Sequence, residues 1–300
     1  MKIIAGIDGG GTGTIVELRS MENKVLERDK FGPFNINSIG EEKLYDLLRE
    51  IFEYILQSGE CEGICIGAAG ISNSAVDDVL KEITQELGFS GKMILKGDHD
   101  IALYGAMSGA PGSVLIAGTG SICTGMDAEG KTARAGGWGH LIDDTGSGYA
   151  LGRDALGAVV RSLDGRSKAT LLSSLIYDFW GISNERQLIE KVYSTSEKSN
   201  IASLSPVVEK AALQGDKTAC TIMEKNAGEL VELVACIYRK LKLESMKLSL
   251  LGSLISKNTL LREDFLKQLA EKLPAVQVKE PDMDAASGAA LWAWQLVQGK

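Results

Sequence analysis

The chain has 300 residues, of which 44% are hydrophobic, and carries a formal net charge of −8. This length and apolar content suffice for two domains of ordinary size, whereas the acidic balance argues against a nucleic-acid partner or an anionic membrane surface, since both need clustered Lys and Arg. No apolar stretch reaches about 18 residues, and the amino terminus runs directly into a strand pattern, so we expect a cytoplasmic protein without a membrane span.

The first third of the chain alternates between strand-like and helix-like patterns. These patterns predict strands near 3–7, 14–19, 24–29, 63–67 and 93–96, and helices over about 41–58, 74–88 and 100–108. Three strands in series, followed by an alternation of strands and helices, indicate a mixed sheet with helices packed against it.

The same order of elements restarts after residue 112. The patterns predict strands near 113–117, 122–127, 131–135, 247–251 and 276–279, and helices over about 145–163, 168–178, 184–192, 203–214, 216–242 and 284–298. Each half then contains a hairpin with a glycine-rich turn. This recurrence indicates an internal duplication, with a site between the two halves.

The first of these turns, Asp8-Gly9-Gly10-Gly11-Thr12-Gly13, lies between two strand patterns. Its backbone N–H groups can converge on a phosphate while Asp8 faces a metal ion. A dinucleotide fingerprint would need a helix directly after the glycines, and a P-loop would need a lysine before its Ser or Thr; neither is present. A plain hairpin, whose glycines serve only backbone geometry, stays open as the alternative.

Two later turns repeat this pattern, in which a strand is followed by glycine together with Ser or Thr. Gly118-Thr119-Gly120-Ser121 follows one strand, and Leu251-Gly252-Ser253-Leu254 follows another and precedes a helix start. Either turn alone is also typical of an ordinary strand-to-helix connection. All three turns in this order favour a site that holds one nucleotide.

The order and spacing of these segments resemble the sugar kinase/heat-shock-protein-70/actin superfamily, and within it the group that joins N-acetylglucosamine kinases to the BadF/BadG/BcrA/BcrD-type ATPases. The resemblance extends to Ala285-Ala286-Ser287-Gly288-Ala289-Ala290, which is similar to the last connecting helix of that superfamily. It implies an α/β fold with two ribonuclease-H-like (actin-like ATPase) domains, each a mixed five-stranded sheet flanked by helices. We expect domains at 1–108 plus 285–300 and at 109–284, an active-site cleft between them that closes over MgATP and an acceptor, and a homodimer.

The resemblance also implies roles for the residues of the three turns. Asp8 would hold Mg²⁺, and the nucleotide would contact Gly10, Gly11, Thr12, Gly118, Thr119, Gly120, Ser121, Gly252 and Ser253. The family's catalytic motif aligns with Gly97-Asp98-His99, at the end of a strand and directly before a helix, so Asp98 is the predicted base for the acceptor hydroxyl and also touches the substrate. Asp100 is the predicted helix cap. The alternative is that Asp98 is itself the N-cap.

The acceptor is indicated by the segment that runs from Gly136 and Gly137 through Trp138 to Asp144. It is similar to the N-acetylglucosamine kinase segment in which a tryptophan packs on the sugar and an aspartate accepts bonds from its hydroxyl groups. An aromatic plane and a charged acceptor suit a pyranose, which has one apolar face and a rim of hydroxyls. The alternatives are that Trp138 is a core residue at a domain interface and that Asp144 caps a helix beginning at Thr145.

Two further loops match parts of the family's sugar site. Asn35 lies in a loop that resembles its sugar-contacting loop, and Gly70 and Ile71 lie in a loop that resembles the one flanking the acetamido or a nearby hydroxyl group. The chain departs from the pattern at Ala135, where N-acetylglucosamine kinases have a cysteine.

These residues predict the ATP-dependent phosphorylation of an amino sugar, with N-acetylglucosamine, converted to its 6-phosphate, as the leading substrate. Glucosamine and N-acetylmuramic acid follow, and Arg134 or Arg153 could pair with the lactyl carboxylate of the latter. The alternative from another class is an ATPase activator of a dehydratase or reductase. That role needs a cysteine for an iron–sulfur cluster before a glycine-rich helix start, and the chain has none at 144–148. Its five cysteines lack C-x-x-C spacing, so we expect buried free thiols.

Overall fold

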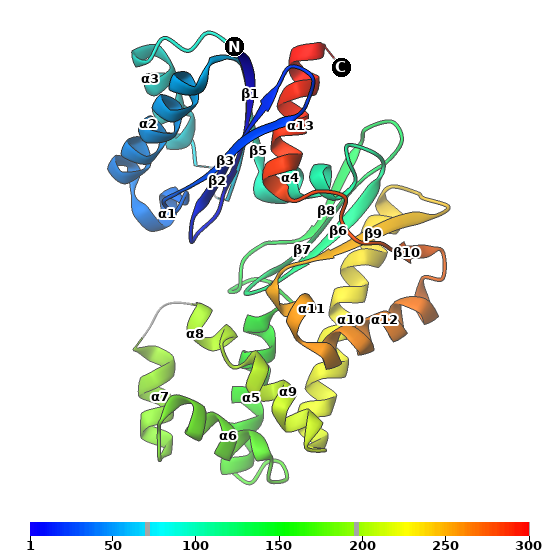
Figure 1. Cartoon of the computed structure of the whole chain (residues 1–300). Coiled ribbons are helices and arrows are strands. Elements are labelled where there is room, and N and C mark those ends of the chain that lie inside the picture. Colours follow the sequence, from blue (N-terminus) through cyan, green and yellow to red (C-terminus); the bar gives the residue numbers. More distant parts are fainter. Residues whose placement is uncertain (70–72, 195–197, 300) are drawn as a thin grey trace. The chain divides into compact units, whose positions relative to one another are not determined.

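The structure, a computed structural model, describes residues 1–69, 73–194 and 198–299. The chain forms two compact units (Figure 1). Unit 1 comprises Met1–Gly112 and Glu280–Lys300, and unit 2 comprises Ser113–Lys279. Each unit contains one five-stranded mixed sheet flanked by helices, so the predicted α/β fold class is confirmed.

The sheet of unit 1 has the strand order β3-β2-β1-β4-β5. Strand β2 pairs antiparallel with β1 and β3, whereas β1, β4 and β5 are mutually parallel. The strands are β1 (Lys2–Gly9), β2 (Thr14–Ser20), β3 (Val25–Phe31), β4 (Glu60–Ala68) and β5 (Lys92–Gly97). The strand predicted directly after the first glycine-rich turn is therefore present, and the carboxyl ends of the three parallel strands lie at one edge of the sheet.

The helices of unit 1 follow from their apolar stripes. They are α1 (Ile36–Ile39), α2 (Glu41–Ser58), α3 (Ala75–Glu86), α4 (Asp98–Ala106) and α13 (Ala285–Gln298). In α2 the buried residues, among them Leu44, Leu48, Ile51 and Ile55, recur every three or four positions and pack in the main core of this unit. The short helix α1 was not predicted, and α4 begins two residues earlier than expected.

Helix α13 brings the end of the chain back to unit 1, where it packs against β1, β4 and α4 through small residues. A Cβ atom placed on Gly6 of β1 would lie 2.1 Å from the backbone nitrogen of Ala290. A Cβ on Gly288 would lie 2.3 Å from the Ile101 carbonyl oxygen and 2.5 Å from the Gly105 nitrogen. The two backbones therefore approach so closely that only glycine fits at these positions.

Gly288→Ala is expected to lower the free energy of unfolding by about 1–3 kcal/mol, because the neighbouring atoms are backbone atoms of α4 and cannot move aside cheaply. Chemical denaturation of the two proteins measures this difference. Gly157→Ala is the matched control, since Gly157 also lies in a helix but a Cβ atom there would have no neighbouring atom within 4 Å. It should raise stability by about 0.5–1 kcal/mol; equal effects of both substitutions would contradict the packing argument.

The sheet of unit 2 has the order β10-β9-β6-β7-β8. Its strands are β6 (Gly112–Ala117), β7 (Ser121–Met126), β8 (Thr132–Gly136), β9 (Met246–Leu251) and β10 (Val276–Val278). Strand β9 pairs parallel with β6 and β10, and β7 pairs antiparallel with β8. When the strands of each unit are counted along the chain, both sheets have the order third, second, first, fourth, fifth, as the predicted duplication requires.

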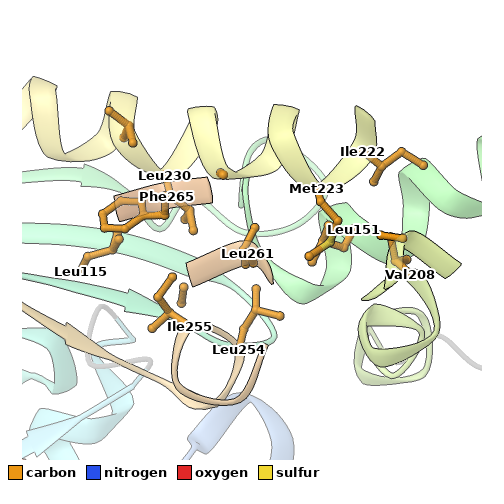
Figure 2. Packing of buried hydrophobic residues seen from close by; sticks show 14 of the residues in the cluster. Leu115, Leu151, Val208, Ile222, Met223, Leu230, Leu254, Ile255, Leu261 and Phe265 are labelled. Atoms are coloured by element: carbon orange, nitrogen blue, oxygen red, sulfur yellow. The ribbon is translucent and has the colours of Figure 1, made fainter. Parts of the chain in front are cut away.

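The helices of unit 2 form its larger part. They are α5 (Gly148–Leu163), α6 (Leu171–Trp180), α7 (Glu185–Tyr193), α8 (Lys198–Ala202), α9 (Ser205–Leu213), α10 (Lys217–Lys240), α11 (Ser253–Lys257) and α12 (Thr259–Lys272). Figure 2 shows Leu115 of β6, Leu230 of α10 and Phe265 of α12 within one buried cluster. Helices α8 and α12 were not predicted, and α5 begins three residues later than expected.

The cysteines are all free thiols, as predicted, but they are not all buried. Cys61, Cys65 and Cys123 are buried, and Cys236 is half-buried. Cys220 is exposed, so the expectation of burial is wrong there, because this residue faces outward on the first turn of α10. Within the described ranges, no helix is both long enough and apolar enough to cross a bilayer.

Candidate functional site

The carboxyl ends of β1, β4 and β5 bring two of the predicted site residues to one edge of the sheet of unit 1. Asp8 lies near the end of β1 and pairs with Gly67 of β4, which pairs in turn with Lys96 of β5. Asp98 follows directly after β5 as the first residue of α4. Ligands bind at such strand ends in open α/β sheets.

The environment of Asp8 disfavours its ionised form. Burial and the negative charges of Asp98 and Asp284 raise the pKa of Asp8 from 3.8 to about 6, and Arg28 opposes this rise. A buried carboxylate surrounded by other carboxylates becomes favourable as an anion when a cation binds beside it. A cation bound beside Asp8 would therefore favour its ionised form.

Asp98 does not cap helix α4. The N-cap position is Gly97, and the carboxylate of Asp100 accepts a hydrogen bond from the Gly97 backbone nitrogen at 3.1 Å. Asp100 is therefore the capping carboxylate, as predicted, and the alternative that Asp98 is the N-cap is wrong. The Asp98 side chain is 52% exposed, which leaves it accessible to a ligand.

The neighbouring histidine favours the ionised form of Asp98. Burial acts to raise the pKa of Asp98, but hydrogen bonding and the charge of His99 outweigh it and lower the pKa overall. The His99 backbone nitrogen donates to Asp98 Oδ1 at 2.8 Å, and His99 Nδ1 lies 3.3 Å from the same oxygen. The carboxylate can therefore accept a hydrogen bond at neutral pH.

The first glycine-rich turn is tied to the loop that follows β3. The Gly10 nitrogen donates to the Gly13 carbonyl at 3.0 Å, which closes the turn, and Gly11 and Thr12 are exposed at its tip. Thr14 Oγ1 donates to the Gly32 carbonyl at 2.7 Å. The tip of this turn is exposed, and its contact with a phosphate stays a prediction.

The loop beyond Gly32 carries Asn35, which is half-buried. Its neighbour Phe34 is buried and packs on Gly9, where a Cβ atom would lie 2.5 Å from the ring. This contact places the loop beside the glycine-rich turn. The predicted ligand residues Gly70 and Ile71 lie outside the described residues.

In unit 2 the second and third turns meet at the ends of β6 and β9. Gly252 has a φ of 96°, and a Cβ atom there would lie 2.4 Å from the Ala117 carbonyl oxygen. A Cβ on Gly118 would lie 3.8 Å from Ser253 Oγ. Gly252 is thus required both by its backbone conformation and by the close approach of the two strand ends.

These two turns open into one pocket of about 350 Å³ in unit 2. It is lined by Gly118, Thr119, Gly148, Ser199, Ala202, Ser203, Ser205, Pro206, Glu209, Ser253, Leu254, Lys257 and Asn258. The structure therefore brings three predicted nucleotide residues together, Gly118, Thr119 and Ser253. Sequence reasoning missed the contributions of α8, α9 and the segment after α11.

The hydroxyl of Ser121 is engaged inside the protein. Ser121 is buried, and its Oγ donates to the Thr145 carbonyl at 2.6 Å. This bond ties the end of the second glycine-rich turn to the segment before α5. A contact of Ser121 with the nucleotide stays a prediction.

Asp144 packs directly against that turn. It is 3% exposed with a φ of 55°, and a Cβ atom on Gly120 would lie 2.8 Å from Asp144 Oδ2. This oxygen accepts no hydrogen bond from the described part of the chain, although Lys198 Nζ forms an ion pair with it at 3.7 Å. The N-cap of α5 is Ser147, so the alternative that Asp144 caps a helix from Thr145 is wrong.

Trp138 is 62% exposed, on the loop that follows β8. The Arg134 guanidinium lies over its ring, 4.4 Å from the centroid. Gly136 and Gly137 have φ angles of 76° and 70°, which turn the chain sharply between the strand and the tryptophan. One face of the ring is therefore covered by a cation.

Comparison with known proteins places these features in a family. The model of the BadF/BadG/BcrA/BcrD ATPase family matches residues 5–293. An N-acetylmuramic acid/N-acetylglucosamine kinase from Clostridium acetobutylicum is 37% identical over 98% of each chain. An N-acetyl-D-glucosamine kinase from Dictyostelium discoideum is 29% identical over 97% of this chain and 98% of its own length.

Among solved structures, a proposed N-acetylglucosamine kinase from Chromobacterium violaceum superposes with a TM-score of 0.76. It is 24% identical and matches over 98% of this chain and 99% of its own. This similarity supports the fold described above.

Proposed function

The chain belongs to the BadF/BadG/BcrA/BcrD ATPase family, and from this premise we propose that it transfers the γ-phosphoryl group of ATP to an amino sugar, N-acetylglucosamine, at its 6-hydroxyl. The enzyme is a sugar kinase, an ATP-dependent phosphotransferase. The choice of acceptor rests on the full-length similarity to the Clostridium acetobutylicum kinase. In the proposal, residues described above serve the nucleotide, the acceptor and the proton transfer.

The triphosphate end of the nucleotide is assigned to the glycine-rich turns. In the proposal, the pocket of unit 2 holds the nucleotide through Gly118, Thr119 and Ser253, while Gly10 to Thr12 contribute the donors of unit 1. Mg²⁺ would be held by Asp8, whose raised pKa fits a carboxylate that pairs with a cation. Bound Mg²⁺ would neutralise the phosphate charge, and it usually keeps several waters.

Asp98 is assigned as the base that accepts the proton of the acceptor hydroxyl. Phosphoryl transfer depends mainly on positioning and electrostatic stabilisation, with a carboxylate to orient the attacking hydroxyl. The exposed, ionised side chain of Asp98 at the strand-end edge beside Asp8 supports this role. His99 would hold that carboxylate in place through Oδ1.

The acceptor is assigned to Trp138 and Asp144 in unit 2 and to Asn35 in unit 1. Arg134 covers one face of the tryptophan ring, so the sugar would stack on the other. The Asp144 oxygen that accepts no hydrogen bond within the described residues supports its role as an acceptor for sugar hydroxyls. Contacts of the sugar with Gly70, Ile71, Gly136 and Gly137 also form part of the proposal.

N-acetylmuramic acid is the second candidate acceptor, and one observation favours it. Of the two arginines considered for its lactyl carboxylate, Arg153 already pairs with Asp154 at 3.1 Å. Arg134 instead lies over the face of Trp138 opposite the one assigned to the sugar, and its N–H groups would pair with a lactyl carboxylate that extends past the edge of the ring. We further propose that units 1 and 2 are the two domains of one active site and that the protein is a homodimer.

An ADP-release assay across a panel of amino sugars and plain hexoses, with MgATP, tests the proposed function. We expect the highest kcat/KM with N-acetylglucosamine, and turnover of N-acetylmuramic acid if Arg134 acts as assigned. Turnover of unsubstituted glucose alone would contradict the amino-sugar assignment. Iron in anaerobically purified protein, without ADP release on any sugar, would instead support the activator function.

A further inference from the structure

Asn258 is a buried amide in the wall of the pocket of unit 2, between helices α11 and α12. The residue is 4% exposed and lines the pocket together with Gly118, Thr119 and Ser253. It forms part of none of the motifs that predict the nucleotide site. The Nδ2 donor of its side chain nevertheless has no hydrogen-bond partner among the described residues.

The orientation of this amide is fixed by its role as the N-cap of α12. Oδ1 of Asn258 accepts a hydrogen bond from the Leu261 backbone nitrogen at 3.0 Å. A flipped amide would place its NH₂ group against that N–H donor, so Nδ2 must remain on the opposite side. In the described part of the chain, the buried Nδ2 has no hydrogen-bond partner.

An unsatisfied buried donor is costly, and native structures rarely keep one without a reason. Glu209, the carboxylate that also lines this pocket, does not meet the need: its Oε1 accepts from Thr259 Oγ1 at 2.9 Å and from the Leu260 nitrogen at 3.2 Å, and no bond joins it to Nδ2. Glu209 and Asn258 thus both brace the start of α12. Of the two side chains only that of Asn258 has a donor group, and this donor is buried without a partner among the described residues.

The position of Asn258 along the chain indicates which part of a nucleotide it would meet. Gly252 lies against Ala117, the last residue of β6 and the one directly before the Gly118–Ser121 turn, and α11 runs from Ser253 toward Asn258. Five residues of helix span about 7 Å. Asn258 therefore lies away from the Gly118–Ser121 turn. The proposed function assigns the phosphates to that turn, so the nucleoside would extend toward Asn258.

We propose that Asn258 is a nucleotide-positioning residue whose Nδ2 donates a hydrogen bond to an acceptor on the base or ribose of ATP. The inference rests on the proposed function, which makes this pocket the nucleotide site. Because the helix cap fixes the amide, the donor is already oriented before the nucleotide binds. This preorganisation favours a nucleoside that presents an acceptor at that point.

Asn258→Ser is the principal test, because serine keeps a capping oxygen for α12 without adding charge and removes the Nδ2 donor. We expect the Kd for ATP, measured by calorimetry, and the KM for ATP to rise about 5–30-fold. The KM for the sugar should stay unchanged. Adenosine should lose inhibitory strength by a similar factor, whereas inhibition by tripolyphosphate should remain as in the wild type.

Asn184→Asp and Asn258→Asp form a matched pair, since both residues are N-caps whose Oδ1 accepts from a helix nitrogen at 3.0 Å. Asn258→Asp replaces the donor by an acceptor and should weaken ATP binding at least as much as Asn258→Ser. Asn184 caps α7 outside the pocket, and its variant should bind ATP normally.

Unchanged ATP and adenosine binding in a folded Asn258→Ser or Asn258→Asp protein would overturn the inference, as would a loss confined to tripolyphosphate. If the wild type binds ATP but phosphorylates no sugar, the proposed function fails, while the binding comparison still tests Asn258. Loss of ATP binding in the wild type itself would overturn both.

Discussion

Asp98→Asn is expected to lower kcat by about 10²–10⁴-fold, because asparagine cannot take the proton of the acceptor hydroxyl. The substitution preserves the size of the side chain and an oxygen that can accept from the His99 nitrogen, so the start of α4 should be undisturbed. The KM values for ATP and sugar should change little. Steady-state kinetics, with melting temperature and ATP affinity measured on the same protein, separate a chemical from a structural effect.

Asp100→Asn is the matched control for this prediction. Asp100 lies two residues further on, and its carboxylate accepts from the Gly97 nitrogen. Asparagine keeps an oxygen that can accept this bond, so the substitution should leave both the helix cap and turnover largely intact. Retained activity in Asp98→Asn, or equal losses in both variants, would contradict the assignment of Asp98 as the base.

The topology around the site could be predicted because local patterns and tertiary structure agree there. The β-branched run after the first glycine-rich turn predicts a strand, and β2 indeed begins at Thr14. That strand excludes a dinucleotide-binding helix at this turn. Asp8 and Asp98 each follow a predicted strand, but it is the parallel pairing of β1, β4 and β5 in the structure that brings them to one edge of the sheet.

Other features depend on contacts that no local pattern reveals. Asp144, Thr145 and Ser147 can all cap a helix, and the packing of Asp144 against Gly120 leaves Ser147 as the cap. Asn258 looks like an ordinary polar residue in a loop until α12, which was not predicted, folds onto it. Its unsatisfied donor arises only when the cap and the pocket wall are both formed.

Asp8→Asn is expected to have opposite effects on activity and on the stability of the magnesium-free protein. Loss of the predicted metal-binding carboxylate should lower kcat/KM by about 10²-fold or more. At about pH 7.5 without magnesium, however, the variant should be more stable than the wild type. The reason is that burial and the charges of Asp98 and Asp284 make the ionised Asp8 unfavourable in the folded protein.

The pH dependence of this difference follows from the sign of the pKa shift. The pKa of Asp8 is about 6 in the folded protein and 3.8 ordinarily, so the folded state holds the proton more tightly than the unfolded state. Below about pH 4 the ionisation of Asp8 therefore takes nothing from the free energy of unfolding of the wild type. Above about pH 6 the loss reaches its full size, at most about 3 kcal/mol.

Denaturation of both proteins at about pH 4 and about pH 7.5 should show the stability advantage of Asp8→Asn only at the higher pH. Added MgATP should stabilise the wild type more than Asp8→Asn, because the substitution removes the carboxylate assigned to the metal. An advantage of equal size at both pH values would show that packing, and not charge, sets the stability of this edge of the sheet.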